Sequence, residues 1–170
     1  MIKSLAKIFF AFIFIVSIAS CEKKSCNNVV CPQGQACNSG KCYCADGYEG
    51  TDCQTLAYLK YVANNRSWYV TETCYSSLPN FPTYTAFFTQ YSTNPSLIEI
   101  NNFMGGNCSI DAYIRTDQSN LGDIIEIPTT SCGGITVSGQ GNYDPANNRI
   151  TFQLNYTTQN GSFQCTQTFY

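Results

Sequence analysis

Sulfur and carboxylate groups are the side chains of this 170-residue sequence that could do chemistry, because the chain contains no histidine. Without an imidazole the sequence lacks the commonest general base, the usual partner of a serine or cysteine nucleophile, and most zinc sites. Eleven cysteines remain, and an odd number implies that one of them does not form an intramolecular disulfide. The first question is which cysteine that is.

Acidic residues are the other candidates, since a pair of carboxylates can hydrolyse a glycosidic bond. The candidates are Glu99, Asp111, Asp117, Asp123, Glu126 and Asp144. Their spacing gives no sign that any two converge, and most fall in expected turns or on the polar face of expected strands. We therefore interpret them as solvated surface groups, and we expect no catalytic residue, no cofactor and no enzyme. The alternative is a secreted carboxylate-dependent hydrolase, which requires two carboxylates converging in a cleft.

The N-terminus predicts export. Lys3 and Lys7 precede an uncharged apolar run at residues 8–19, which is too short to span a bilayer but typical of a signal peptide. The next residues, IASC at 18–21, resemble the lipobox of bacterial lipoproteins. The resemblance implies a signal peptide at residues 1–20, acylation of Cys21, and a lipidated tether at 21–25. An ordinary signal peptide that ends beside a cysteine is the alternative.

Assigning Cys21 to lipid leaves ten cysteines, an even number that suits disulfides in an oxidising compartment. Without Lys3 and Lys7, seven basic residues face eleven acidic ones, a net charge of −4. No basic patch stands out, so nucleic acid is not expected as a partner. We expect a membrane partner through the N-terminal lipid anchor, and a location in the cell envelope at the outer membrane, on its periplasmic face or the cell surface. Multiple acyl chains make such an anchor lasting.

Six cysteines lie within residues 26–53, and the segment CYCADGYEGTDC closes this stretch at residues 42–53. The spacing resembles an epidermal growth factor-like domain over the whole of 26–53. The resemblance implies the pairs Cys26 with Cys37, Cys31 with Cys42, and Cys44 with Cys53. So short a chain cannot bury enough apolar surface to fold without such staples. Lys23 and Lys24 stand where calcium-binding members need carboxylates, so no metal is expected.

The remaining sequence is β-rich. A linker with a short helix is expected at residues 54–66, because apolar residues have rough helical spacing over 55–62. Runs of Thr, Tyr, Phe, Ile and Val separated by turn residues then predict eight strands. Their ranges are 67–74, 83–91, 97–102, 108–115, 121–127, 135–143, 149–157 and 162–169. The fold class is therefore all-β, with an eight-stranded antiparallel up-and-down barrel expected and a β-sandwich as the alternative.

Short motifs along these strands resemble small lipocalin-like domains of bacterial exported proteins. They are SWYVTETC at 67–74, NNF at 101–103, IP at 127–128, VSGQG at 137–141 and QCT at 164–166. The resemblance implies a lipocalin-like barrel domain at residues 67–170. Arg66 stands where such domains usually have a glycine, two residues before Trp68.

The last four cysteines test this topology. The first and last strands of a closed meander are neighbours, so Cys74 and Cys165 are expected to pair across the seam. Cys108 and Cys132 then pair across a hairpin centred on the polar residues 118–120. Facing Ile114 with Ile125 puts the hairpin centre half a residue earlier, a difference that a bulge near Pro128 could absorb.

Binding or adhesion at the envelope is the expected function, with a protein, a glycan or a small apolar ligand as the partner. The choice among these partners depends on which way the aromatic side chains of the barrel domain face. They include Trp68, Tyr69, Tyr84, Phe87, Phe88, Tyr91, Phe103, Tyr113, Phe152, Tyr156, Phe163 and Phe169. If they face inward they fill the core, and a carrier of a small apolar ligand needs a cavity among them. Aromatic rings on the outer surface instead suit contact with carbohydrate or protein.

Overall fold

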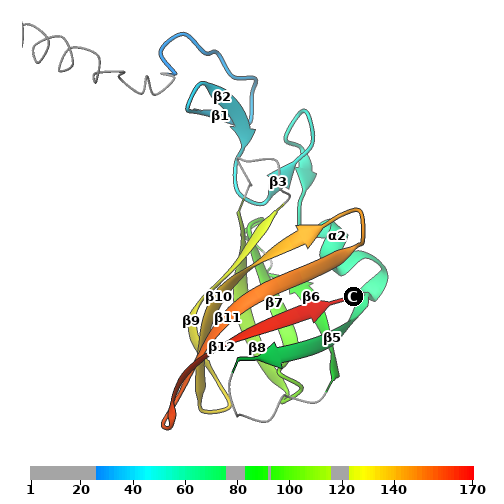
Figure 1. The fold of residues 1–170 in the computed structure, drawn as a ribbon. Coiled ribbons are helices and arrows are strands. Elements are labelled where there is room, and N and C mark those ends of the chain that lie inside the picture. The colour runs from blue at the N-terminus through cyan, green and yellow to red at the C-terminus, as the bar shows by residue number, and fades with distance from the viewer. Residues whose placement is uncertain (1–25, 76–82, 92, 116–122) are drawn as a thin grey trace, which may run out of the picture.

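The computed structural model of the chain describes residues 26–75, 83–91, 93–115 and 123–170. The expected leader, Cys21 with its tether, and Asp117 lie outside these residues. Figure 1 shows a small N-terminal module at one end of a β-barrel, and the chain passes from one to the other through a short helix. No helix among the described residues combines the length and the apolar character needed to cross a bilayer.

Eight antiparallel strands form the barrel, and each pairs with its neighbours in the chain. They are β5 (Ser67–Cys74), β6 (Tyr84–Gln90), β7 (Leu97–Phe103), β8 (Cys108–Arg115), β9 (Ile124–Cys132), β10 (Ile135–Asp144), β11 (Arg149–Thr158) and β12 (Gly161–Phe169). Pairing of β12 with β5 closes the sheet, which removes every free edge. The up-and-down barrel is confirmed, and the sandwich alternative is wrong.

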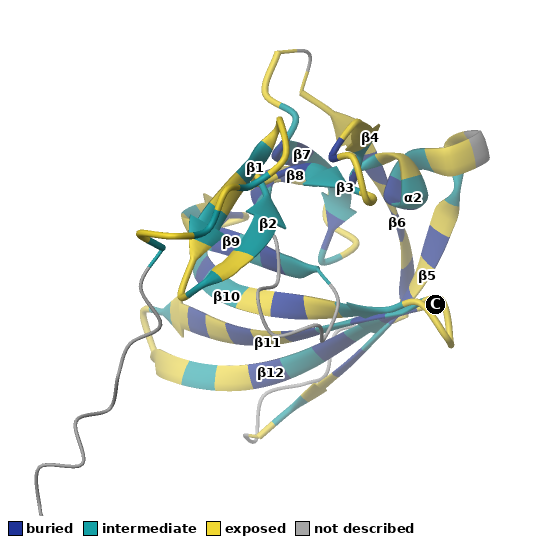
Figure 2. Cartoon of the chain, turned by 90° about the horizontal axis from the view of Figure 1, so that it is seen from above, coloured by how far each residue is buried: buried dark blue, intermediate teal, exposed yellow. Residues whose placement is uncertain are grey.

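Side chains alternate between the interior and the solvent, as the two-residue period of a strand requires. Figure 2 shows this as alternating bands of buried and exposed residues along the strands. In β5 the buried positions are Trp68, Val70 and Glu72, and their neighbours along the strand are exposed or half-buried. Buried aromatic side chains fill much of the interior: Trp68, Tyr84, Phe88, Phe103, Phe152, Tyr156 and Phe169. Most of the aromatic set is therefore core, and Tyr69, Phe87 and Tyr91 are exposed.

The N-terminal module contains two small sheets. Strands β1 (Gln35–Asn38) and β2 (Lys41–Cys44) form one hairpin, and β3 (Tyr48–Glu49) pairs with β4 (Thr55–Leu56). Ser39 and Gly40 form the two-residue turn of the hairpin, both with positive φ as that tight turn requires. Disulfides join Cys26 to Cys37, Cys31 to Cys42, and Cys44 to Cys53, the pairs expected from the sequence.

The linker differs from the expected single helix over residues 55–62. Its first residues form β4, because Thr55 and Leu56 pair with Glu49 and Tyr48. The helix α2 (Leu59–Val62) is consequently one turn long, and a 3₁₀ turn, η1 (Ala63–Asn65), leads into β5. Figure 2 shows α2 at one end of the barrel. Tyr61 on this helix is fully buried in the barrel core, so α2 plugs that end. We call it the module end.

Two disulfides lie toward the opposite end, which we call the disulfide end. Cys74 faces Cys165 directly across the seam between β5 and β12, and the two are bonded. Cys108 is bonded to Cys132, as expected. Ile114 pairs with Ile125, and the register between β9 and β10 shifts by one residue at Pro128, so the expected bulge is confirmed.

Candidate functional site

A group of polar side chains is buried inside the barrel near the disulfide end. Glu72 on β5 and Gln167 on β12 are direct cross-strand partners, and both face inward. Glu72 is 9% exposed and Gln167 is fully buried. Tyr84, the first residue of β6, and Tyr156 on β11 complete the group. We call these four residues the Glu72 cluster.

Hydrogen bonds satisfy only part of the Glu72 cluster. The Gln167 side-chain amide donates to the Tyr156 hydroxyl at 2.8 Å. Both of these side chains also act on Glu72 as hydrogen-bond partners. Among the described residues, however, no group meets the geometry of a hydrogen bond with Glu72 Oε2, Gln167 Oε1 or the Tyr84 hydroxyl. Buried polar atoms without a partner are rare in folded proteins, and each requires an explanation such as a bound water, an ion or a ligand.

Burial dominates the electrostatics of the Glu72 cluster. Desolvation raises the pKa of Glu72, and hydrogen bonds from Tyr156 and Gln167 offset only part of this effect. Burial also raises the pKa of Tyr156, with the nearby charge of Glu72 acting in the same direction. Desolvation also raises the pKa of Tyr84, and the Met104 backbone and the Gln167 side chain offset only part of this effect. The phenols therefore stay neutral at physiological pH, and the carboxyl is the one group of the cluster that can carry charge.

The Glu72 cluster can recognise a ligand through its hydrogen-bond acceptor oxygens. Glu72 Oε1 lies 3.7 Å from the sulfur of Cys74, which the disulfide leaves without a proton to donate. Glu72, Cys74 and Cys165 are the one group of metal-ligand side chains within the part of the chain that is described. Because the two sulfurs are bonded to each other, they cannot act as thiolate ligands. What remains is one carboxyl and two neutral acceptors.

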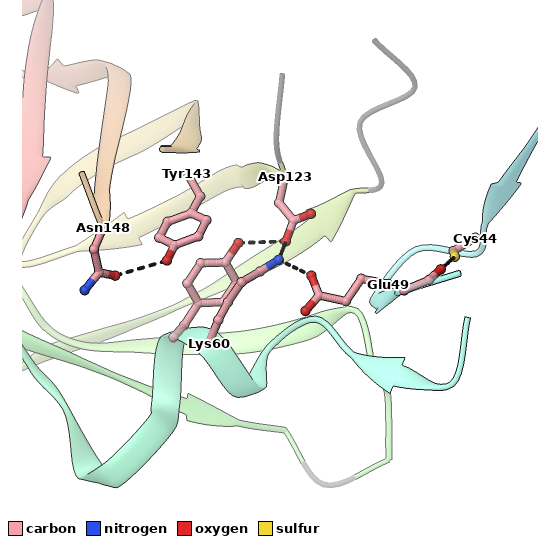
Figure 3. Close-up of polar contacts among 8 residues, drawn as sticks. Cys44, Glu49, Lys60, Asp123, Tyr143 and Asn148 are labelled. Carbon is pink, nitrogen blue, oxygen red and sulfur yellow. Dashed lines mark hydrogen bonds and ion pairs between the residues drawn. The ribbon is translucent and has the colours of Figure 1, made fainter. Parts of the chain in front are cut away.

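A second polar group joins the N-terminal module to the module end of the barrel (Figure 3). The Tyr61 hydroxyl donates to Asp123 at 2.8 Å. Lys60 pairs with Asp123 at 2.8 Å and also with Glu49 of the module. Burial alone would lower the pKa of Lys60, but the bonds and charges of both carboxylates outweigh it and raise that pKa. Lys60 therefore stays charged and links the two parts.

Close backbone packing strengthens this junction. A Cβ atom on Gly47, whose φ is +83°, would lie 2.4 Å from the carbonyl carbon of Pro95, so only glycine fits between the module and the β6–β7 loop. Arg115 at the end of β8 bonds Asp46 of the module at 3.1 Å and Glu126 of β9 at 2.9 Å. The module is therefore packed directly against the barrel.

The acidic residues considered as catalytic candidates are dispersed, with one exception. Glu99 and Asp111 are cross-strand partners on β7 and β8. The antiparallel register, which residue spacing alone did not reveal, brings them together. Both occupy outward-facing positions, Asp111 is exposed, and Glu99 accepts a bond from Thr89. Asp123 and Glu126 belong to the junction, and Asp144, the last residue of β10, accepts a hydrogen bond from Asn147 in the following turn.

The outer face carries a patch of aromatic side chains at the module end. Tyr69 and Tyr170 exchange two backbone hydrogen bonds, and Phe87 lies diagonally across from Tyr69 on β6. Each of the three is 44–53% exposed. Beside Phe87 lies a groove of about 330 Å³, lined by Asn65, Arg66, Ser67, Phe87, Phe88 and Thr89. We call Tyr69, Phe87 and Tyr170 the aromatic patch.

Arg66, which departs from the lipocalin-like pattern, has a defined role at the margin of this groove. Its guanidinium carbon lies 3.6 Å from the centroid of the Trp68 ring, and its Nη atoms donate to Asn148. Arg66 thus covers the buried indole and ties β5 to the β10–β11 turn.

Sequence reasoning did not single out Glu72, Gln167, Lys60 or Tyr61 as site residues. A signal for the first two was present, because both occupy the inward parity of their strands: Glu72 follows Trp68 and Val70 at two-residue steps, and Gln167 lies between Cys165 and Phe169. A polar residue in an apolar series marks a buried polar position. Lys60 and Tyr61 carried no such signal, since their partners come from distant segments.

Comparison of the chain with models of known protein families, with curated proteins and with solved structures found no match.

Proposed function

We propose that the protein is a lipid-anchored envelope protein whose barrel binds a small molecule at its disulfide end, without catalysis. The observation that carries the proposal is the Glu72 cluster, in which Glu72 Oε2, Gln167 Oε1 and the Tyr84 hydroxyl meet no hydrogen-bond partner of suitable geometry among the described residues, inside a largely apolar core. Such atoms cost about 1 to 3 kcal/mol each when left unsatisfied, so a bound molecule that satisfies them would gain that amount. Helix α2 plugs the module end, so the proposal has the molecule reach the cluster from the disulfide end.

The other parts of the chain fit a tethered binding protein. The lipobox-like residues 18–21 support acylation of Cys21, and the cysteine pairing of the N-terminal module supports an epidermal growth factor-like domain. The barrel itself supports a lipocalin-like domain. In this arrangement the anchor holds the protein at the outer membrane, and the N-terminal module lies between the anchor and the barrel in the chain.

Two measurements test the proposal. Intact mass spectrometry of the protein purified from membranes should show an acyl adduct and ten oxidised thiols; a protein without lipid mass would contradict the anchor. A thermal-shift screen with a library of small amines, acids and alcohols should find compounds that raise the melting temperature of the native protein but not of a Gln167→Leu variant that is folded by circular dichroism. Equal shifts for both proteins, or none for either, would contradict binding at the cluster.

Adhesion is a second candidate function, and the aromatic patch favours it. Three large, half-exposed rings on adjacent strands offer contact area with little loss of side-chain freedom. Replacing Tyr69 and Phe87 together by alanine should reduce binding of the protein to whole envelope fractions. Tyr75→Ala, which removes an exposed ring at the other end of β5, is the matched control. Equal binding by all three proteins would refute this role.

A further inference from the structure

We propose that the Glu72 cluster binds the primary ammonium group of a small amine. This inference rests on the proposed binding function and names the class of molecule that the barrel takes. It starts from two acceptor atoms that have no hydrogen-bond partner among the described residues, Glu72 Oε2 and Gln167 Oε1, and from the oxygen of the neighbouring Tyr84 hydroxyl, which can accept a further bond. The Gln167 amide already donates to Tyr156, and both side chains act on Glu72, while the Met104 backbone and Gln167 act on Tyr84.

An ammonium group matches these oxygen atoms in the number of hydrogen bonds and in charge. It carries three N–H donors, no acceptor and one positive charge. The cluster offers three acceptors and one group that can be negative. An anion would meet the Glu72 carboxylate and be repelled, and a water molecule supplies two donors and no charge. A quaternary ammonium supplies charge without donors, and a hard divalent metal ion such as Mg²⁺ or Ca²⁺ takes about six or more oxygen ligands, more than the cluster offers.

The charge of Glu72 has no other compensation inside the described barrel. The groups that face it are Tyr84 from β6, Tyr156 from β11 and Gln167 from β12, all neutral, together with the disulfide sulfur of Cys74. Burial without a cation raises the pKa of Glu72. A bound ammonium would reverse this effect, because an opposite charge within a few ångströms favours the ionised carboxyl. Affinity should therefore rise with pH as Glu72 ionises, until the amine itself loses its proton near pH 10 or above.

The surroundings of the cluster suit the rest of such a molecule. Val70 precedes Glu72 on the inner face, Phe152 pairs with Gln167, and Leu154 pairs with Cys165; all three are buried and apolar. A ligand with an ammonium head and a short apolar body would place its charge on the polar atoms and its carbon atoms on these side chains. This combination separates the site from one for a purely apolar ligand.

The test uses three probes that share one apolar chain: n-hexylamine, 1-hexanol and hexyltrimethylammonium. Calorimetry on the full-length oxidised protein at pH 7.5 should show hexylamine binding at least about tenfold more tightly than either of the others, since a lost charge-assisted contact in a buried site costs several kcal/mol. Glu72→Gln should lose at least about tenfold in hexylamine affinity and keep its hexanol affinity. Glu99→Gln, at a carboxylate on the outer face, should bind like the native protein.

The outcomes separate the two proposals. If hexanol binds as tightly as hexylamine and Glu72→Gln changes neither, the barrel binds small molecules and the ammonium inference is wrong. If none of the probes binds, both proposals fail. Displacement of hexylamine by sodium or potassium chloride, but not by tetramethylammonium chloride at the same ionic strength, would assign the site to an inorganic cation and also overturn the inference. Loss of hexylamine binding in Glu72→Gln alone supports it.

Discussion

Replacing Glu72 by glutamine should make the protein more stable at neutral pH. Glutamine has the shape of the protonated carboxyl but cannot ionise, and its amide can donate to Gln167 Oε1, which has no hydrogen-bond partner among the described residues. The change therefore removes a buried charge and can satisfy an unpartnered acceptor at once. Each such acceptor costs about 1 to 3 kcal/mol, so we expect the free energy of unfolding to rise by about that amount at pH 7.5.

The pH dependence follows from the direction of the pKa shift. Because burial raises the pKa of Glu72 in the folded state, its favourable contribution is complete below the unfolded pKa, about 4.3, and is lost as pH rises through the folded pKa. Native protein and Glu72→Gln should therefore be nearly equal in stability at pH 4. The difference should grow with pH and then level off once Glu72 is ionised in both states.

Urea unfolding followed by circular dichroism at several pH values between 4 and 8 measures this difference directly. Glu99→Gln serves as the control, because that carboxylate lies on the outer face and its replacement should change stability by less than about 0.5 kcal/mol. A Glu72→Gln variant that is less stable than the native protein at pH 7.5 would refute the reasoning. So would a stability difference that does not change with pH.

Three further predictions concern the scaffold. Replacing both Cys74 and Cys165 by alanine should lower the free energy of unfolding in guanidinium by about 4 to 5 kcal/mol, because their bond joins residues 91 positions apart; a loss below about 1 kcal/mol would contradict this. Gly47→Val should split a single calorimetric transition into two, since its side chain would collide with Pro95; one unchanged transition would show that the module is not packed there. Tyr61→Phe should cost about 1 to 3 kcal/mol and Tyr61→Ala about 3 to 5 kcal/mol in urea unfolding, and equal costs would mean that the ring does not plug the barrel.

The strands and disulfides could be predicted because they follow from local and countable features. Period-two patterns place the strands within a few residues, and the order of strands in a closed meander brings Cys74 to Cys165. The three pairs within residues 26–53, by contrast, follow only from the resemblance to an epidermal growth factor-like domain. Pro128 cannot donate to a ladder, which marked the site of the bulge. The helix expected over 55–62 is longer than the observed one. Helical spacing of four apolar residues carries no information about pairing with another strand, and Thr55 and Leu56 pair with β3.

The candidate site was harder to predict because its members meet only after the barrel closes. Glu72 and Gln167 are far apart in the sequence and become direct partners only across the seam between β5 and β12. Likewise Glu99 and Asp111 meet through a register that their spacing does not encode. The alternation along β5 is enough to mark Glu72 as an inward position. It gives no information on which atoms of the cluster lack a partner.

The central claim is that the Glu72 carboxyl lies in the barrel interior, without a compensating cation, at a site that takes an ammonium group. A ¹³C NMR titration of this carboxyl, assigned by comparison with Glu72→Gln, tests the claim most directly. The account predicts a pKa above the usual range for glutamate in the free protein and a lower pKa after saturation with n-hexylamine. A carboxyl that titrates like an exposed glutamate, with no response to the amine, would contradict it.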